Sequence, residues 1–149
     1  MQRVREDTSY KASLDAYLNE MKGDVWTVEM KDRDFRDIEL FGAYGKGKLP
    51  KKVCIGAVSH RTLQADRPED VTGAIHRALE HIAPEQLIVS SDCGFGRQGC
   101  NREIAFYKAS SIAQGCNLVR KELGLGEQTY VPAADARLQT DVVPKAGEK

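Results

Sequence analysis

The chain lacks long apolar runs, a net charge and closely spaced cysteines. No apolar stretch approaches the roughly 18 residues that a membrane span needs, and the first residues carry no apolar run typical of a signal peptide. The 22 basic and 22 acidic side chains among the 149 residues cancel, so no global field favours nucleic acid or an anionic membrane surface. These absences predict a cytoplasmic protein that binds neither nucleic acid nor a membrane.

The four cysteines form no Cys-x-x-Cys pair, which is the common signature of a local metal knuckle. A cytosolic chain keeps such thiols reduced, and a metal site would have to be assembled by the fold from distant residues. Cys54 lies in the middle of a predicted strand, and Cys100 and Cys116 lie near or within a predicted helix. Packing is therefore the better interpretation for these three cysteines.

Apolar periodicity predicts alternating helices and strands within a single domain. Helices are expected over about 10–21, from Asp34 to Phe41, from about 66 to Pro84 and over about 102–123, and strands over 24–30, 53–58 and 87–89. Residues 126–149 show no sustained periodicity, which predicts an irregular and partly disordered tail after a folded unit of residues 1–125.

Two of the strands are continuous apolar runs, 53–58 and 87–89, of the kind found in a sheet that is buried on both faces. Asp34 is a good N-cap for the second helix, and Asp66 with Glu69 can form a capping box for the third. The alternation of strands and helices predicts an α/β fold with a parallel sheet and right-handed crossovers. Three strands are too few to close a barrel.

Chemically useful side chains follow each strand at its carboxyl end, where parallel α/β folds gather their functional groups. Glu29 follows the first strand, Ser59-His60-Arg61 the second, and Asp92-Cys93 the third. A carboxylate, an imidazole and a thiol at one rim are the groups that bind zinc or carry protons. Each also has a structural interpretation: Cys93 as a small buried hydrophobe, Glu29 as an exposed charge, and His60 as a partner of a backbone carbonyl.

The segment Asp92-Cys93-Gly94, preceded by an apolar strand and by Pro84-Glu85-Gln86-Leu87, resembles a segment of cobalamin-independent methionine synthases. The strand that ends at Glu29 is similar to the family's preceding strand. Gly56 to Asp70 is similar to the intervening strand and helix. The resemblance covers about residues 10–125 and is strongest over 53–123.

What the resemblance implies is the C-terminal part of a TIM barrel that transfers a methyl group from 5-methyltetrahydrofolate, as its polyglutamate, to a thiol such as homocysteine. It implies zinc as cofactor, with Glu29 and Cys93 as ligands, His60 as a proton carrier, and Arg61 and Asp92 as substrate-binding residues. In that family a His-x-Cys pair on an earlier strand supplies two more ligands. Nothing in residues 1–23 matches that pair, so two ligands are expected from outside this chain.

Two positions depart from the family's pattern. An ungapped alignment from Gly56 places Arg61, and not His60, where the family has a catalytic histidine. Because adjacent strand residues point to opposite faces, one residue of register is expected to decide which of the two faces the site. Ser91 stands where the family has proline.

Two other functions remain open at this point. The chain can belong to a related zinc enzyme that alkylates another small thiol, such as coenzyme M, with Arg61 or Arg97 pairing with a sulfonate or carboxylate. It can also be an inactive barrel fragment that works only by association, either with itself or with a partner that supplies the N-terminal half, because open sheet edges are association sites.

Overall fold

The computed structural model describes residues 9–96 and 99–126 of the chain. Its regular elements alternate between helices and strands, and the strands form one parallel three-stranded sheet in the order β1-β2-β3. The elements in chain order are η1 (Tyr10–Ala12), η2 (Ala16–Glu20), β1 (Val25–Val28), η3 (Lys31–Arg33), η4 (Ile38–Tyr44), β2 (Lys52–Val58), α1 (Pro68–Leu79), η5 (Pro84–Gln86), β3 (Leu87–Ser91) and α2 (Arg102–Glu122).

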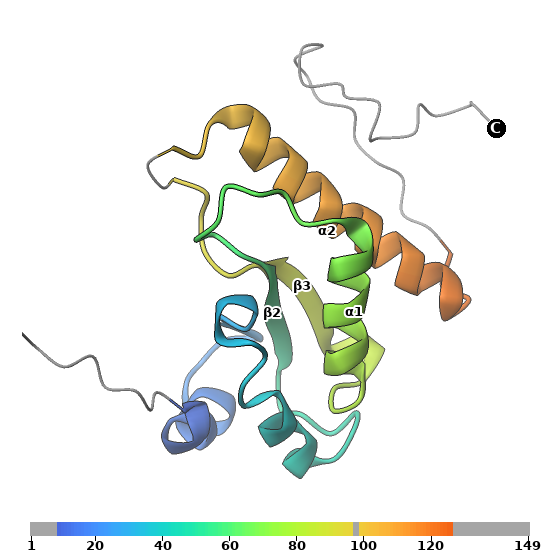
Figure 1. The fold of residues 1–149 in the computed structure, drawn as a ribbon. Helices are drawn as coiled ribbons and strands as arrows, with labels where there is room; N and C mark the ends of the chain where they lie inside the picture. The colour runs from blue at the N-terminus through green and yellow to red at the C-terminus, as the bar shows by residue number, and fades with distance from the viewer. Residues whose placement is uncertain (1–8, 97–98, 127–149) are drawn as a thin grey trace, which may run out of the picture.

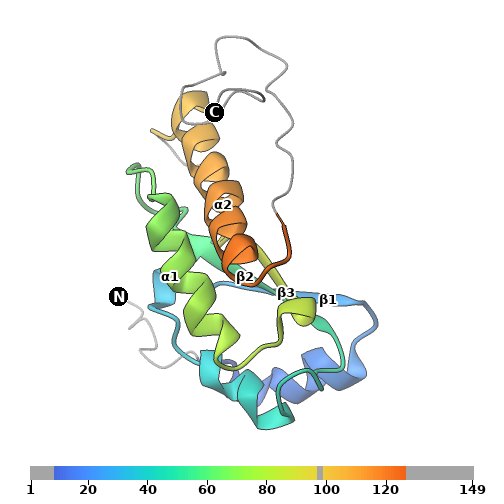
Figure 2. The ribbon, with the colours of Figure 1, turned by 90° about the vertical axis from the view of Figure 1, so that its right-hand side faces the viewer.

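The two long helices lie side by side and pack against β2 and β3 (Figure 1). They approach closely at Gly115, where an added Cβ would lie 2.6 Å from the Cβ of Val71. Turning the molecule shows α2 above the sheet and the short helices η2 and η4 below it (Figure 2). This layered arrangement with parallel strands confirms the predicted α/β fold class.

The central strand β2 is buried on both faces, as its continuous apolar run predicts, and Val53, Ile55 and Val58 have no exposed surface. The same prediction is wrong for β3, because it is an edge strand here and Ile88 is 37% exposed. On β1, Trp26 stacks on Tyr17 with ring centroids 4.8 Å apart. This aromatic contact attaches the N-terminal helical segment to the sheet.

The predicted helix over 10–21 is instead two short pieces, η1 and η2, separated near Ser13. The backbone amide of Ser13 donates to the carbonyl of Tyr10, and so does its hydroxyl. Serine side chains compete with the helical ladder in this way. The apolar face of the segment survives, because Leu14 and Leu18 are both buried in the core.

The prediction that Asp34 caps a helix over Phe35 to Phe41 is wrong. Asp34, Phe35 and Asp37 all have positive φ, and the 3-10 helix η4 begins only at Ile38. The physical cause is Asp37, whose buried carboxylate accepts hydrogen bonds from Ser9 Oγ, the Tyr10 amide and Arg33 Nη2. The long-range bonds from Ser9 and Tyr10 outweigh the local preference for a helix.

Helix α1 begins one residue later than its predicted capping box. The backbone amide of Arg67 donates to Asp70 Oδ2 at 3.2 Å, so Arg67 and Asp70 take the roles expected of Asp66 and Glu69. Helix α2 ends as predicted before Gly124, which has φ of +70°. Its buried face is partly polar, since Lys108 and Ser111 are buried there.

Cys54 is buried in β2 and Cys116 packs against the hydrophobic core, as expected of packing cysteines. His76 is exposed on α1, and His81, which follows this helix, is partly buried. None of the described helices combines the length and the apolar character that a membrane crossing requires.

Candidate functional site

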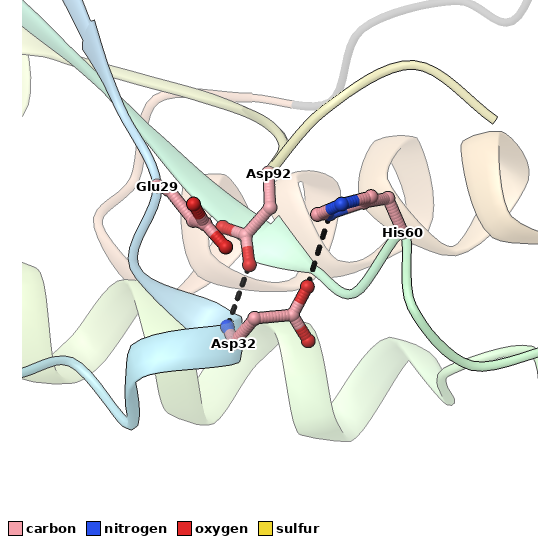
Figure 3. A group of neighbouring side chains, drawn as sticks. All are labelled: Glu29, Asp32, His60 and Asp92. Atoms are coloured by element: carbon pink, nitrogen blue, oxygen red, sulfur yellow. Dashed lines mark hydrogen bonds and ion pairs between the residues drawn. The ribbon is translucent and has the colours of Figure 1, made fainter. Parts of the chain in front are cut away.

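Residues from the carboxyl ends of all three strands converge at one rim of the sheet. Glu29 and Asp32 follow β1, His60 follows β2, and Asp92 follows β3. One possible ligand atom from each of these four side chains lies within 4.8 Å of the others. Figure 3 shows the four side chains turned toward one another above the end of β2.

Asp92 connects the two outer strands of the sheet. Its Oδ1 accepts hydrogen bonds from the amides of Met30 (2.8 Å) and Lys31 (3.0 Å), and its Oδ2 accepts one from the amide of Asp32 (2.6 Å). To reach them, the side chain crosses β2 at Gly56, where a Cβ would lie 1.9 Å from Oδ1. Burial raises the pKa of Asp92, the three backbone hydrogen bonds oppose this, and the nearby Asp32 carboxylate adds to the rise.

Asp32 orients the residues at the start of the loop after β2. Its Oδ1 accepts a hydrogen bond from Ser59 Oγ, and its Oδ2 lies 3.0 Å from Nδ1 of His60. The Asp32 and His60 side chains are only 9% and 11% exposed. The pair is at ion-pair distance but not in line for a hydrogen bond, so these two buried atoms have no hydrogen-bond partner among the described residues.

Arg61 pairs with Glu29 at the outer side of the rim. Its Nη2 donates to Glu29 Oε1 at 3.0 Å, and its Nε lies 3.5 Å from Asp32 Oδ2. The Arg61 side chain is 55% exposed and that of Glu29 is 29% exposed. Both groups are therefore more accessible to a substrate or a metal ion than Asp32, whose side chain is 9% exposed.

The register question about His60 and Arg61 has a structural answer. β2 ends at Val58, so both residues lie in the following loop, where the strand alternation between faces no longer applies. His60 and Arg61 both approach Asp32 Oδ2, at 3.0 and 3.5 Å. The expectation that one residue of register excludes one of them from the site is therefore wrong.

Cys93 stays apart from this group. It is exposed in the loop after β3, and among the described residues its sulfur does not belong to the cluster of possible ligand atoms. Its carbonyl accepts a hydrogen bond from Ser91 Oγ at 2.9 Å, which stabilises the turn just beyond the strand. The structure thus brings Glu29, His60, Arg61 and Asp92 together. Cys93 directly follows Asp92 in the sequence, but it is exposed on the surface and lies outside this group.

The donor set fits zinc in part. Glu29 and Cys93 offer an accessible carboxylate and an accessible thiol, and zinc binds both groups. The buried Nδ1 of His60 and Oδ2 of Asp32 also keep unused bonding capacity. Asp92 offers less, since its two oxygens already accept three backbone hydrogen bonds. The rim of the sheet therefore carries groups of the kinds that zinc binds, while Cys93 lies outside the cluster that they form.

Two residues at the rim were not singled out from the sequence. Asp32 stands three residues after Glu29 at the end of a strand, and that spacing was the available signal. Lys108 is wholly buried in α2 and donates to the carbonyls of Ser59 and Gln64. No local pattern marks it, because a lysine on an amphipathic helix is usually solvated.

A small cavity of about 270 Å³ lies beside the cluster, on the side of α1. Charged and polar side chains form its wall, with one lysine and three aspartates among them: Lys31, Asp32, Ser59, Thr62, Gln64, Ala65, Asp66 and Asp70. Asp32 thus belongs to the wall of the cavity and also lies beside His60 and Arg61.

A parallel sheet with polar side chains gathered at the strands' carboxyl ends is an arrangement that β/α barrels have. Residues 8–113 match the family described as the catalytic domain of cobalamin-independent synthases, and the chain belongs to that family. This confirms the resemblance found in the sequence.

Individual relatives agree with this assignment. The chain is 30% identical over 116 residues to a methionine synthase of Thermococcus kodakarensis. The aligned residues make up 78% of the chain and 33% of the relative. It is 32% identical over 107 residues to a methionine synthase of Saccharolobus islandicus, and these residues make up 72% of the chain and 31% of that relative. The chain therefore spans about a third of the length of the curated relatives it matches.

A solved structure has the same fold. The B12-independent methionine synthase from a Shewanella species, in complex with selenomethionine, matches 77% of this chain and 32% of its own with a TM-score of 0.64. The sequence identity of 22% limits the comparison to the fold.

Proposed function

We propose that the chain forms the C-terminal part of a zinc-dependent methyltransferase barrel. The barrel would move a methyl group from 5-methyltetrahydrofolate polyglutamate to a thiol such as homocysteine, giving methionine. Residues 1–125 would form the barrel part and 126–149 an irregular tail, most of which lies outside the described residues. The observation that carries the proposal is the convergence of Glu29, Asp32, His60 and Asp92 at the rim of a chain that belongs to this family.

Glu29 and Cys93 would hold the zinc ion together with two further ligands from outside this chain. Bound zinc would keep the acceptor sulfur as a thiolate at neutral pH, because the cation stabilises the deprotonated form. The exposed position of Cys93 is compatible with a site that is completed by another segment. The cytoplasm is the compartment we propose, since thiols there remain reduced.

His60 is suited to moving a proton near the acceptor. Its Nδ1 lies 3.0 Å from the Asp32 carboxylate, and Nε2 is the ring nitrogen that remains for contact with a substrate. Ser59 donates to the same aspartate and so limits its rotation. A fixed carboxylate behind an imidazole is a recurring way to orient a general base.

Arg61 and Asp92 are proposed to contact substrate in different ways. Arg61 keeps donors free beyond its bond to Glu29, and its 55% exposure allows a bidentate contact with a substrate carboxylate. Asp92 has less to offer, since Oδ1 accepts two hydrogen bonds and Oδ2 accepts one, which leaves one acceptor position. Its main role here is to hold the loop after β1.

The test combines the chain with a polypeptide that carries the remaining part of such a barrel. Zinc content and methionine formation from methyl-folate and homocysteine are then measured. Cys93→Ser is expected to lower both by on the order of 100-fold. Cys116→Ser, which removes a partly buried thiol on α2, is the matched control and should leave both unchanged. A zinc-free wild-type assembly, or an unaffected Cys93→Ser variant, would contradict the proposal.

A second candidate keeps the zinc chemistry but changes the thiol. The exposed guanidinium of Arg61 supports it, since a sulfonate binds Arg as a carboxylate does. Arg97, the other arginine proposed for this contact, lies outside the described residues. Assays with homocysteine and coenzyme M, each with methyl-folate and with epoxide donors, separate the two candidates.

A third candidate is a catalytically inactive fragment that acts only by association. Both edges of the sheet, β1 and β3, are unpaired within the described residues, and Val25 and Ile88 on them are 45% and 37% exposed. Unpaired strand edges favour addition of another chain. Size-exclusion chromatography of the purified chain, with and without the rest of the barrel, tests this. A chain that elutes as a stable monomer and does not bind the added polypeptide would exclude both self-association and barrel completion.

A further inference from the structure

Lys108 has an unusual environment for a lysine. It lies in α2 with no exposed surface, in a molecule where most other charged groups reach the solvent. Burying an ammonium group is costly unless hydrogen bonds and an opposite charge compensate for the lost hydration. Its neighbours therefore have to account for its presence.

The Lys108 ammonium has three acceptors for its three N–H groups. Nζ donates to the carbonyl of Ser59 at 3.1 Å and to that of Gln64 at 2.6 Å, and lies 3.3 Å from Asp66 Oδ2. Ser59 starts the loop after β2, and Gln64 and Asp66 end it just before α1. The single ammonium group, which comes from α2, thus connects the first residue of this loop with its last residues.

The loop that Lys108 closes carries His60 and Arg61. Ser59, whose carbonyl Lys108 binds, also donates its hydroxyl to Asp32, the partner of His60. At the other end, Asp66 lies between Lys108 and Lys31, whose Nζ is 3.7 Å from its Oδ1. The path of the backbone through His60 and Arg61 is therefore set between two fixed points.

We propose that Lys108 is a positioning residue, which orients His60 and Arg61 toward the rim by holding both ends of the loop that carries them. Its importance for catalysis rests on the proposed methyl transfer, whereas its effect on the loop does not. Without the ammonium group, two carbonyls and one carboxylate would lose their donor, and the loop would move to reach water.

The side chains of the three histidines provide a readout that does not require activity. The measurement is NMR of the full chain with isotope-labelled histidines. The His60 ring signal is assigned as the one that disappears in His60→Asn. Lys108→Met keeps the volume but removes the donors and the charge, and it is expected to shift the ring signals of His60. The signals of His76, exposed on α1, and of His81 should stay in place. Lys108→Arg, which keeps charge and donors, should restore the His60 signals in large part.

The matched control is Lys121→Met, an exposed lysine on the same helix, and it should leave all three histidines unchanged. Asp66→Asn is the second variant, since it removes only the opposite charge and is milder than Lys108→Met. It should shift His60 in the same direction by a smaller amount. If Lys108→Met does not fold, Asp66→Asn decides in its place.

In the zinc-loaded assembly, Lys108→Met is expected to lower kcat by about 10- to 100-fold with KM changed by less than about threefold. Unmoved His60 signals in folded Lys108→Met, or a uniform shift of all three histidines that Lys108→Arg does not reverse, would overturn the positioning role. An assembly of wild-type chain without methyl transfer would instead refute the proposed function, and the histidine signals would still decide the role of Lys108.

Discussion

The Asp92 side chain occupies the space that a side chain at Gly56 would need. A Cβ on Gly56 would lie 1.9 Å from Oδ1 and 2.6 Å from the Cα of Asp92. This close approach lets Asp92 reach over β2 to the backbone after β1. The geometry of the rim therefore depends on a glycine in the middle strand, which contributes no functional group of its own.

Gly56→Ala should destabilise the fold strongly. The added methyl group overlaps Asp92, so either the β3 end or the loop after β1 has to move, and overpacking of this kind costs about 1–3 kcal/mol or more. Urea denaturation measures the loss in the free energy of unfolding. Gly73→Ala is the control, because a Cβ added at this position in α1 would have nothing within 4 Å, and it should stabilise by roughly 0.5–1 kcal/mol. Equal effects of the two changes would be inconsistent with this account.

Asp92→Ala should release the loop after β1. Three backbone amides lose their acceptor, and a buried donor without a partner costs about 1–3 kcal/mol. Amide hydrogen exchange at Met30, Lys31 and Asp32 should accelerate, while exchange in α1 stays slow. Asp92→Asn keeps one carbonyl oxygen and should show a smaller acceleration. Unchanged protection of these three amides in Asp92→Ala would contradict the bracing role.

The four cysteines should differ in their rate of alkylation. Cys93 is exposed and should react first with iodoacetamide, whereas Cys54 is buried and should react last. Burial raises the pKa of Cys116, partly opposed by Arg120, so its thiolate fraction at pH 8 is reduced and its reaction should speed up as the pH rises further. Mass spectrometry of peptides from a time course gives the order. In the completed barrel, zinc should protect Cys93 alone, and protection of Cys116 instead would contradict the ligand assignment.

The pair of Arg67 and Asp70 at the start of α1 predicts a pH-dependent contribution to stability. The hydrogen bond from Arg67 lowers the pKa of Asp70. A lowered carboxyl pKa stabilises the fold above the unfolded-state pKa, and this contribution is lost as the pH falls through the folded-state value. Arg67→Gln should therefore lower the free energy of unfolding near neutral pH and have no effect near about pH 2.

A double-mutant cycle with Asp70→Asn isolates that pair. In the Asp70→Asn background, the effect of Arg67→Gln should depend much less on pH, because only the weaker Coulombic effect of Glu69 on Arg67 remains. The interaction is small in any case, since both side chains are largely exposed and screened by solvent. A pH dependence that persists in the Asp70→Asn background would show that another group is responsible.

Much of the fold could be predicted from local patterns. The apolar run over 53–58 identified β2, and the apolar stripe after Pro68 identified α1, because burial on one or both faces imposes a fixed period on a sequence. The segment around Asp34 could not be predicted in this way. There, the distant partners of the Asp37 carboxylate decide the backbone conformation, and no local pattern reports them.

The site was predictable to a similar degree. Glu29, His60, Arg61 and Asp92 could be named because each follows a strand, and parallel strands deliver their carboxyl ends to one rim. The sequence by itself thus determined four of the residues that reach the rim, although not Asp32 or Lys108, and its resemblance around Asp92-Cys93-Gly94 agrees with the family of the chain.

Only the tertiary structure decided how these residues are used. It pairs Arg61 with Glu29, places Asp92 over Gly56 as a brace, and directs the buried Lys108 ammonium at the two ends of the loop after β2. The physical reason is that the bonding partner of a charged side chain depends on which groups the fold brings within about 3 Å of it. In this chain those partners come from other strands and helices, so spacing along the sequence does not reveal them.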